Sequence, residues 1–281
     1  MKILVTGAGG YIGKHVVSKL LMLGHEVIAV DTHLDEVDER AVKMEIDLFQ
    51  IDYQGLYEKM GRPDICLHMA WRDGFIHNSV YHLGDLSSHY KFLLSLIEQG
   101  LTHVAIMGTM HEVGYWEGKV DEHTPCNPLS QYGIAKDTLR RSMMLYCKQN
   151  NICLHWIRGF YIMGDDMRNH SIFTKLLEAN KLGKEFFPFT SGKTKYDFID
   201  VNDFAYQIAK TILQRKIVGI VNCCSGTPIS LSECVEKFIK EKGLRIKLKY
   251  GAYPDRPYDS PCIFGDNTKI LNILSADEES R

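Results

Sequence analysis

KILVTGAGGYIGKH, residues 2–15, is the segment from which the rest of the chain can be interpreted. Lys2 to Thr6 is a short apolar run with β-branched residues, which predicts a buried strand. The glycine-rich residues 7–13 predict a turn, and apolar residues then recur at helical spacing until Gly24. A strand, a glycine turn and a helix together present backbone N–H groups and a helix N-terminus to a pyrophosphate. The segment therefore predicts a dinucleotide site.

The glycines of this turn have separate roles in the prediction. Gly7 allows the tight turn, Gly10 lets a diphosphate approach the backbone, and Gly13 lets the helix pack on the strand. Tyr11 and Ile12 lie between Gly10 and Gly13, and we assign them to the same site. An ordinary glycine turn is the alternative, which the flanking strand and helix disfavour.

An acidic residue follows the second predicted strand, residues 26–30. Asp31 comes about twenty residues after the glycines, where a carboxylate bonds the hydroxyls of an adenosine ribose. A negative charge there repels a 2′-phosphate, and no Arg or Lys occurs between Asp31 and Glu39. We therefore expect NAD rather than NADP as the cofactor; the alternative is a solvated loop acid.

Composition narrows the classes of function. The 281 residues can form one large domain or two small ones, and the formal charge of −2 gives no reason to expect nucleic acid or an acidic membrane as a partner. No apolar run is long enough to span a bilayer, and the N-terminus is already a strand rather than a signal peptide. The eight cysteines include no C-x-x-C pair, which favours reduced thiols in a cytoplasmic protein. The twelve histidines lack the spacing of metal ligands, so we expect no metal site.

Strands and helices are predicted to alternate over the first part of the chain. Further strands are expected at 42–46, 64–70, 103–107 and 152–158, and helices at 90–99 and 131–150. This order predicts an α/β fold with a Rossmann-type doubly wound parallel sheet in residues 1–164. Beyond Gly164 the alternation stops, so residues 165–281 are expected to form a smaller substrate-binding region, with the strand at 217–224 returning to the main sheet.

A redox dinucleotide needs a neighbouring group that moves a proton, and a tyrosine four residues before a lysine is one candidate. On a helix this spacing puts both side chains on one face, and the lysine charge lowers the pKa of the tyrosine. The spacing alone is weak evidence, because three such pairs occur: Tyr115/Lys119, Tyr132/Lys136 and Tyr206/Lys210.

Position in the chain separates the three pairs. Residues 115–119 contain a glycine and lie in a predicted loop, whereas Tyr206 and Lys210 lie on a C-terminal helix surface. Tyr132 and Lys136 begin the helix after the strand 103–107, next to the strand ends that should face the cofactor. We therefore assign Tyr132 and Lys136 as the catalytic pair.

Thr109 lies just beyond the predicted strand 103–107. Its hydroxyl can hold a substrate alcohol or carbonyl while a tyrosine moves the proton. The alternative is a strand-end residue that bonds its own backbone.

Taken together, the sequence resembles the extended short-chain dehydrogenase/reductase family, in its nucleotide-sugar epimerase/dehydratase branch. The likeness spans nearly the whole chain. Its carriers are TGAGGYIG (6–13), Asp31, Asp47-Leu48, HMA (68–70), Gly108-Thr109, PLSQYGIAK (128–136) and DFIDVND (197–203).

The resemblance implies roles for further residues. It makes Thr109, Tyr132 and Lys136 a catalytic trio. It also places Asp47 and Leu48 beside the adenine, and Ala70, with Met69, on the pyrophosphate and nicotinamide side. Its implied substrate is a nucleoside diphosphate sugar, with substrate-binding residues assigned to His111, Glu112, Arg168 and Arg256. Relatives commonly clamp the diphosphate with a late arginine; Arg256 is the first choice here, with a surface arginine as the alternative.

Departures from the family pattern narrow the reaction. Where 4,6-dehydratases carry an adjacent Asp-Glu pair after the catalytic hydroxyl, this chain has Met110-His111-Glu112, which disfavours dehydration. Trp71 replaces a common alanine. We expect an NAD-dependent enzyme acting at the 4-position of a nucleotide-linked hexose through a 4-keto sugar, with 4-epimerisation first. The alternatives are a 4-ketoreductase and a non-catalytic NAD-binding sensor or scaffold. A homodimer is one assembly open to such a chain.

Overall fold

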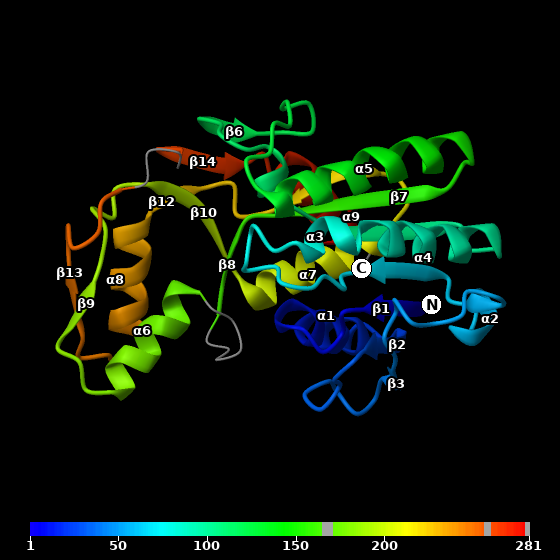
Figure 1. The fold of residues 1–281 in the computed structure, drawn as a ribbon, viewed down its shortest axis with the longest axis horizontal. Coiled ribbons are helices and arrows are strands. Elements are labelled where there is room, and N and C mark those ends of the chain that lie inside the picture. The colour runs from blue at the N-terminus through cyan, green and yellow to red at the C-terminus, as the bar shows by residue number, and fades with distance from the viewer. Residues whose placement is uncertain (165–170, 256–259, 279–281) are drawn as a thin grey trace.

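The computed structural model describes residues 1–164, 171–255 and 260–278. A seven-stranded sheet lies at its centre, and all its neighbouring strands are parallel (Figure 1). In spatial order the strands are β3 (Val42–Glu45), β2 (Glu26–Asp31), β1 (Lys2–Thr6), β4 (Ile65–His68), β5 (His103–Thr109), β7 (Cys153–Gly159) and β11 (Gly219–Cys223). The chain runs outward from β1 to β3 and then crosses to β4 on the other side of β1, so the order reverses between β1 and β4. Ligands bind at this point in doubly wound sheets.

Helices cover both faces of this sheet, because its strands are apolar on both sides. In β1, Ile3 and Val5 face one hydrophobic cluster and Leu4 faces the other. The first cluster is closed by α1 (Tyr11–Met22), α7 (Val201–Ile212) and α9 (Thr268–Glu278). The second is closed by α2 (Leu56–Lys59), α4 (Leu86–Glu98) and α5 (Gln131–Gln149). A single turn, α3 (Tyr81–Gly84), precedes α4.

A second lobe carries its own sheets and its own core. It extends away from the main sheet in Figure 1. One sheet has the order β12 (Pro228–Ser230), β10 (Lys195–Asp200), β14 (Cys262–Gly265) and β6 (Gly118–Val120), with β8 (Tyr161–Met163) paired to β10. A two-stranded sheet joins β9 (Phe186–Pro188) to β13 (Lys247–Lys249), and the helices are α6 (Ile172–Lys181) and α8 (Leu231–Glu241). Aromatic residues such as Phe173, Phe189 and Phe198 fill the core of this lobe.

The two lobes interleave along the chain. β6, from the first 164 residues, lies in the second lobe, whereas β11, α7 and α9 return to the main sheet. The predicted parallel Rossmann sheet is confirmed, as is the strand that returns near 217–224. The strands of the second sheet were not predicted. Several have only three residues, too few for an alternating pattern to show. Among the described residues, no helix has the length and apolar character needed to cross a membrane.

Candidate active site

The glycine turn has the tight geometry that its sequence predicts. Gly7 has a positive φ of 70°, and a Cβ there would lie 2.5 Å from the Ala70 nitrogen. A Cβ on Gly13 would lie 2.1 Å from the Gly7 oxygen, so this glycine lets α1 pack on the turn. By contrast, a Cβ on Gly10 would meet only the Gly7 oxygen, at 3.2 Å, so the space beyond Gly10 is open to a ligand. A further glycine was missed in the sequence: a Cβ on Gly9 would lie 1.8 Å from the His33 oxygen.

Seven of the predicted cofactor residues gather at one cleft of about 420 Å³ beside the switch point. They are Gly7, Gly10, Asp31, Asp47, Leu48, Met69 and Ala70, joined there by Trp71 and Arg72. The N-terminus of α1 opens next to this cleft, and no described side chain caps it. Its backbone N–H groups and the open space at Gly10 fit a dinucleotide pyrophosphate.

Asp31 closes the cleft at the end of β2. One carboxylate oxygen accepts a hydrogen bond from the Gly9 N–H at 3.0 Å, and the other accepts from the Thr32 N–H at 2.7 Å. The side chain is therefore held in the cleft, where the predicted site requires a carboxylate that can accept from a ribose hydroxyl.

Loss of the Asp31 charge is expected to weaken the preference for NAD. In Asp31→Ala, the NADP-to-NAD ratio of dissociation constants should fall by about tenfold or more, because a 2′-phosphate no longer meets a carboxylate. Asp31→Asn is the matched control for the turn, because its amide oxygen can still accept from the Gly9 N–H. Calorimetric titration of both nucleotides measures the ratio, and a parent protein that binds NADP more tightly would refute the assignment.

The predicted trio meets between β5 and α5. Thr109 is the last residue of β5, and its Oγ1 accepts from the His111 N–H at 3.3 Å. Tyr132 and Lys136 lie one turn apart at the start of α5, which Ser130 caps. The Lys136 ammonium donates to the Met107 carbonyl at 2.7 Å and lies 3.8 Å from the centre of the Trp71 ring. The structure thus brings all three predicted side chains together.

Burial opposes charge on both titrating groups of the trio. It raises the pKa of the Tyr132 phenol to about 12, although a hydrogen bond with the Thr109 side chain lowers that pKa in part. Burial also lowers the pKa of the Lys136 ammonium to about 7, against the influence of the Glu112 charge. Proton transfer at neutral pH therefore requires a further positive charge or a substrate hydrogen bond beside Tyr132.

The rival Tyr–Lys pairs lie elsewhere. Tyr115 is 46% exposed and its hydroxyl donates to Glu117. Tyr206 and Lys210 lie on α7, with the Lys210 ammonium 5.5 Å from the Tyr206 ring centre. None of these residues lines either of the two cavities described here.

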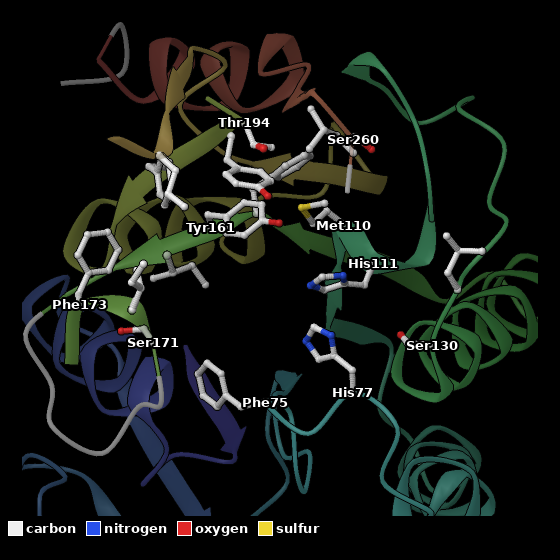
Figure 2. A pocket seen from close by; sticks show the side chains of 18 of the residues that line it. Phe75, His77, Met110, His111, Ser130, Tyr161, Ser171, Phe173, Thr194 and Ser260 are labelled. Carbon is white, nitrogen blue, oxygen red and sulfur yellow. The ribbon is translucent and has the colours of Figure 1, made fainter. Parts of the chain in front are cut away.

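A larger cavity of about 590 Å³ lies between the lobes (Figure 2). Tyr11 and Ile12, predicted with the cofactor, line it at the start of α1, and Met110, His111 and Ser130 line it beside the trio. Its wall in the second lobe is largely aromatic: Phe160, Tyr161, Phe173, Tyr196 and Phe198. The trio itself lines neither cavity but contacts residues of both. Trp71 of the cofactor cleft contacts Lys136, and His77 and His111 of the larger cavity contact Tyr132.

His77 is a site residue that the sequence analysis missed. Its ring stacks on Tyr132 with centroids 5.8 Å apart and lies 4.4 Å from the His111 ring, and Figure 2 shows both imidazoles facing the cavity. Its carbonyl also accepts from the Tyr132 N–H at 2.9 Å. His77 belongs to a loop without a motif, so no local pattern in the sequence could have identified it.

The structure corrects the predicted role of Glu112 in substrate binding. This residue was assigned to the substrate, but its side chain is fully buried and does not line the cavity. Glu112 and His111 belong to the short 3₁₀ helix η1 (Met110–Glu112), where successive side chains point about 120° apart. His111 therefore faces the cavity and Glu112 faces the protein interior. Arg168 and Arg256 lie outside the described residues, and their predicted role stays a prediction.

One cluster of potential metal ligands does occur in the described part of the chain, away from the trio. His103, Cys153 and His155 bring their ligand atoms within 4.8 Å of one another at the first residues of β5 and β7. The two imidazoles hydrogen-bond each other at 3.0 Å, and His155 Nε2 lies 3.1 Å from the Ile217 carbonyl oxygen. Hydrogen bonds within the chain thus account for the cluster.

Comparison with known proteins shows the family of the chain. Residues 3–224 match the NAD dependent epimerase/dehydratase family. The chain is 43% identical over 269 residues to dTDP-6-deoxy-L-talose 4-dehydrogenase (NAD(+)) of Aggregatibacter actinomycetemcomitans, covering 94% of this chain and 99% of that protein.

Solved structures with the same fold are more distant in sequence. UDP-glucose 4-epimerase of Thermus thermophilus with NAD has a TM-score of 0.80 at 19% identity, covering 99% of this chain and 93% of that chain. UDP-glucuronic acid 4-epimerase of Bacillus cereus, with UDP-glucuronic acid and NAD, has a TM-score of 0.81 at 22% identity, covering 98% and 93%. At these identities the likeness shows the fold.

Proposed function

The chain belongs to the NAD-dependent epimerase/dehydratase family, and from this membership we propose that it is a reversible 4-dehydrogenase of a dTDP-linked 6-deoxyhexose. The observation that carries the proposal is the position of Thr109, Tyr132 and Lys136 between the cofactor cleft and the larger cavity. A sugar in the larger cavity would meet the trio on the side opposite the cofactor cleft. The non-catalytic sensor or scaffold is disfavoured, because all three reactive side chains are present and in contact.

Each residue of the trio has a distinct task in this reaction. In the oxidative direction, Tyr132 accepts the proton of the sugar 4-hydroxyl while Thr109 hydrogen-bonds the same oxygen. Lys136, when protonated, stabilises the Tyr132 phenolate. The residues of the cleft would hold NAD, which would supply the hydride acceptor for oxidation and, when reduced, the hydride donor for reduction. In the reductive direction, Tyr132 returns the proton to the oxygen of the 4-ketone.

Net dehydrogenation is favoured over the 4-epimerisation that the sequence analysis put first. The relative at 43% identity is named for 4-dehydrogenation, whereas the epimerases among the solved structures share the fold at about half that identity. The same three residues serve both reactions. What differs is whether reduced cofactor leaves the site before the ketone is reduced again.

The cavity wall beside the trio suits a 6-deoxy sugar. Met110 and Phe75 line the cavity on either side of the His77–His111 pair, so the wall offers apolar surface there. A methyl group at C6 buries against such a wall without leaving a hydroxyl unpaired, whereas a hydroxymethyl group requires a polar partner.

The experiment is to mix purified protein with NAD⁺ and dTDP-6-deoxy-L-talose. Absorbance of NADH should rise in proportion to the sugar consumed, and NMR should identify a 4-ketone. Sugar converted to its 4-epimer without net NADH would contradict the dehydrogenase and favour the epimerase. dTDP-glucose is the control, because it keeps the nucleotide but carries the hydroxymethyl group, and it should react poorly. We also propose a cytoplasmic location, which the eight unpaired cysteines support. A homodimer is a further proposal.

A further inference from the structure

Glu112 is a carboxylate enclosed beneath the trio. Its side chain has no exposed surface, and donors from three elements surround it. One oxygen accepts from the Thr109 N–H at 2.7 Å and from the Trp156 indole N–H at 3.0 Å. The other lies 3.4 Å from an Arg158 guanidinium nitrogen and 3.5 Å from the Arg140 Nε. Burial raises the pKa of the Glu112 carboxyl above its ordinary value, but all the partners described here are donors, and they favour the ionised carboxylate.

These contacts connect the elements that carry the reactive groups. Thr109 ends β5, Trp156 and Arg158 belong to β7, and Arg140 lies on α5 one turn after Lys136. Glu112 and Thr109 also form a reciprocal capping box for η1, in which each side chain accepts from backbone of that short helix. Without Glu112, the Thr109 N–H and the Arg158 guanidinium would both be buried with a lost partner.

We propose that Glu112 is a positioning residue that fixes Thr109 at the end of β5 and supplies a negative charge beneath Tyr132 and Lys136. The inference rests on the proposed 4-dehydrogenase reaction, in which these three residues move the proton. It assigns to Glu112 a task distinct from substrate contact, because the carboxylate is fully buried and is held by protein donors.

The charge of Glu112 acts on both titrating members of the trio. It raises the pKa of Lys136 and that of Tyr132, because a nearby anion favours the protonated form of each group. The other charged or titratable groups packed around Glu112 are Arg158 from β7, Arg140 and Asp137 from α5, and Cys126 from the preceding loop. Arg140 is shared with Asp137, whose carboxylate lies 2.5 Å from its terminal nitrogen, so Arg158 is the principal counter-charge.

The test uses Glu112→Gln, which keeps one side-chain oxygen for Thr109 and Trp156 but removes the charge. The kcat for sugar oxidation should fall about tenfold, with the KM for NAD nearly unchanged. Both limbs of the kcat–pH profile should move to lower pH, on the order of one unit, because both groups deprotonate more readily without the anion. Glu112→Asp should leave the limbs in place, since it keeps the charge. Glu117→Gln, at an exposed glutamate five residues further on, should change neither kcat nor the positions of the limbs.

The double variant Glu112→Gln with Arg158→Met separates charge from packing. It removes both members of the ion pair, so the limbs should return toward their wild-type positions even though the packing is altered further. A reduced kcat with unmoved limbs in Glu112→Gln would reduce the residue to a structural role and overturn the proposal.

A second readout does not depend on the sugar reaction. Because the Lys136 ammonium lies on the Trp71 ring, its ionisation should change Trp71 fluorescence, measured as the difference from a Trp71→Phe background. In Glu112→Gln the midpoint of this titration should fall, and an unchanged midpoint would overturn the inference. If wild-type protein does not oxidise the sugar but the midpoint of the Trp71 fluorescence titration still falls in Glu112→Gln, only the proposed function is refuted.

Discussion

Tyr132→Phe is expected to lower kcat at least about a hundredfold, while NAD binds with nearly wild-type affinity. Phenylalanine retains the ring that packs on His77, so the loop and α5 should stay in place. Only the hydroxyl that exchanges a proton with the sugar oxygen is lost. Steady-state NADH formation measures the first effect, and calorimetric titration with NAD measures the second.

Two tyrosines provide matched controls for this substitution. Tyr115→Phe removes a hydroxyl from the exposed loop, and Tyr206→Phe removes one from α7, where Tyr206 lies next to α1. Neither change should alter kcat by more than about twofold, because Tyr115 is exposed and Tyr206 contacts Lys19 and Lys210 rather than the trio. If either control matched the loss in Tyr132→Phe, the catalytic pair would be wrongly assigned.

Gly13→Ala and Gly10→Ala should separate folding of the turn from binding of the cofactor. In Gly13→Ala the new methyl would lie 2.1 Å from the Gly7 oxygen, so α1 must shift, and the free energy of unfolding should fall by about 1–3 kcal/mol. NAD affinity should fall with it. In Gly10→Ala the methyl meets only one protein atom, at 3.2 Å, and the backbone already has an extended conformation. Stability should therefore be retained, while the methyl occupies the space meant for the diphosphate.

Thermal melts and NAD titrations of both variants provide the measurement. We expect Gly13→Ala to lose stability and NAD affinity together, and Gly10→Ala to lose about tenfold or more in NAD affinity with an unchanged melting temperature. Gly84→Ala is a control outside the turn, where a Cβ has nothing within 4 Å. Wild-type NAD affinity in Gly10→Ala would remove this glycine from the cofactor site.

His111 and Glu112 are adjacent in the chain, but their side chains lie in different environments. His111 lines the cavity, and burial lowers the pKa of its imidazole to about 4, so a sugar bound there would meet a neutral ring. A neutral imidazole can donate one hydrogen bond and accept another, which suits a sugar hydroxyl. The anion and the neutral ring are adjacent in the chain, and the turn of η1 directs them to opposite sides of the site.

The glycine turn, Asp31 and the Tyr132–Lys136 pair could be predicted because each depends on residues that are close in the chain. A positive φ, a strand end and an i, i+4 spacing are local properties, and they appear in the sequence as residue types at fixed intervals. The alternation of strands and helices then predicted the parallel sheet, because connections between parallel strands obey a common handedness. The order of these elements along the chain thus predicts that the residues assigned to the cofactor lie at one edge of the sheet.

Contacts between distant segments could not be inferred in this way. Trp71 meets Lys136, His77 meets Tyr132, and Glu112 meets Arg158, each across tens of residues in the chain. Whether a glutamate faces a substrate or an arginine depends on what packs over it from elsewhere, because burial is a property of the assembled core. The same holds for the short strands of the second lobe, whose pairing depends on β6 reaching β14 from the other half of the chain. Local pattern therefore specified the glycine turn and the placement of Tyr132 and Lys136 on one helix, whereas long-range packing placed the charges and rings around them.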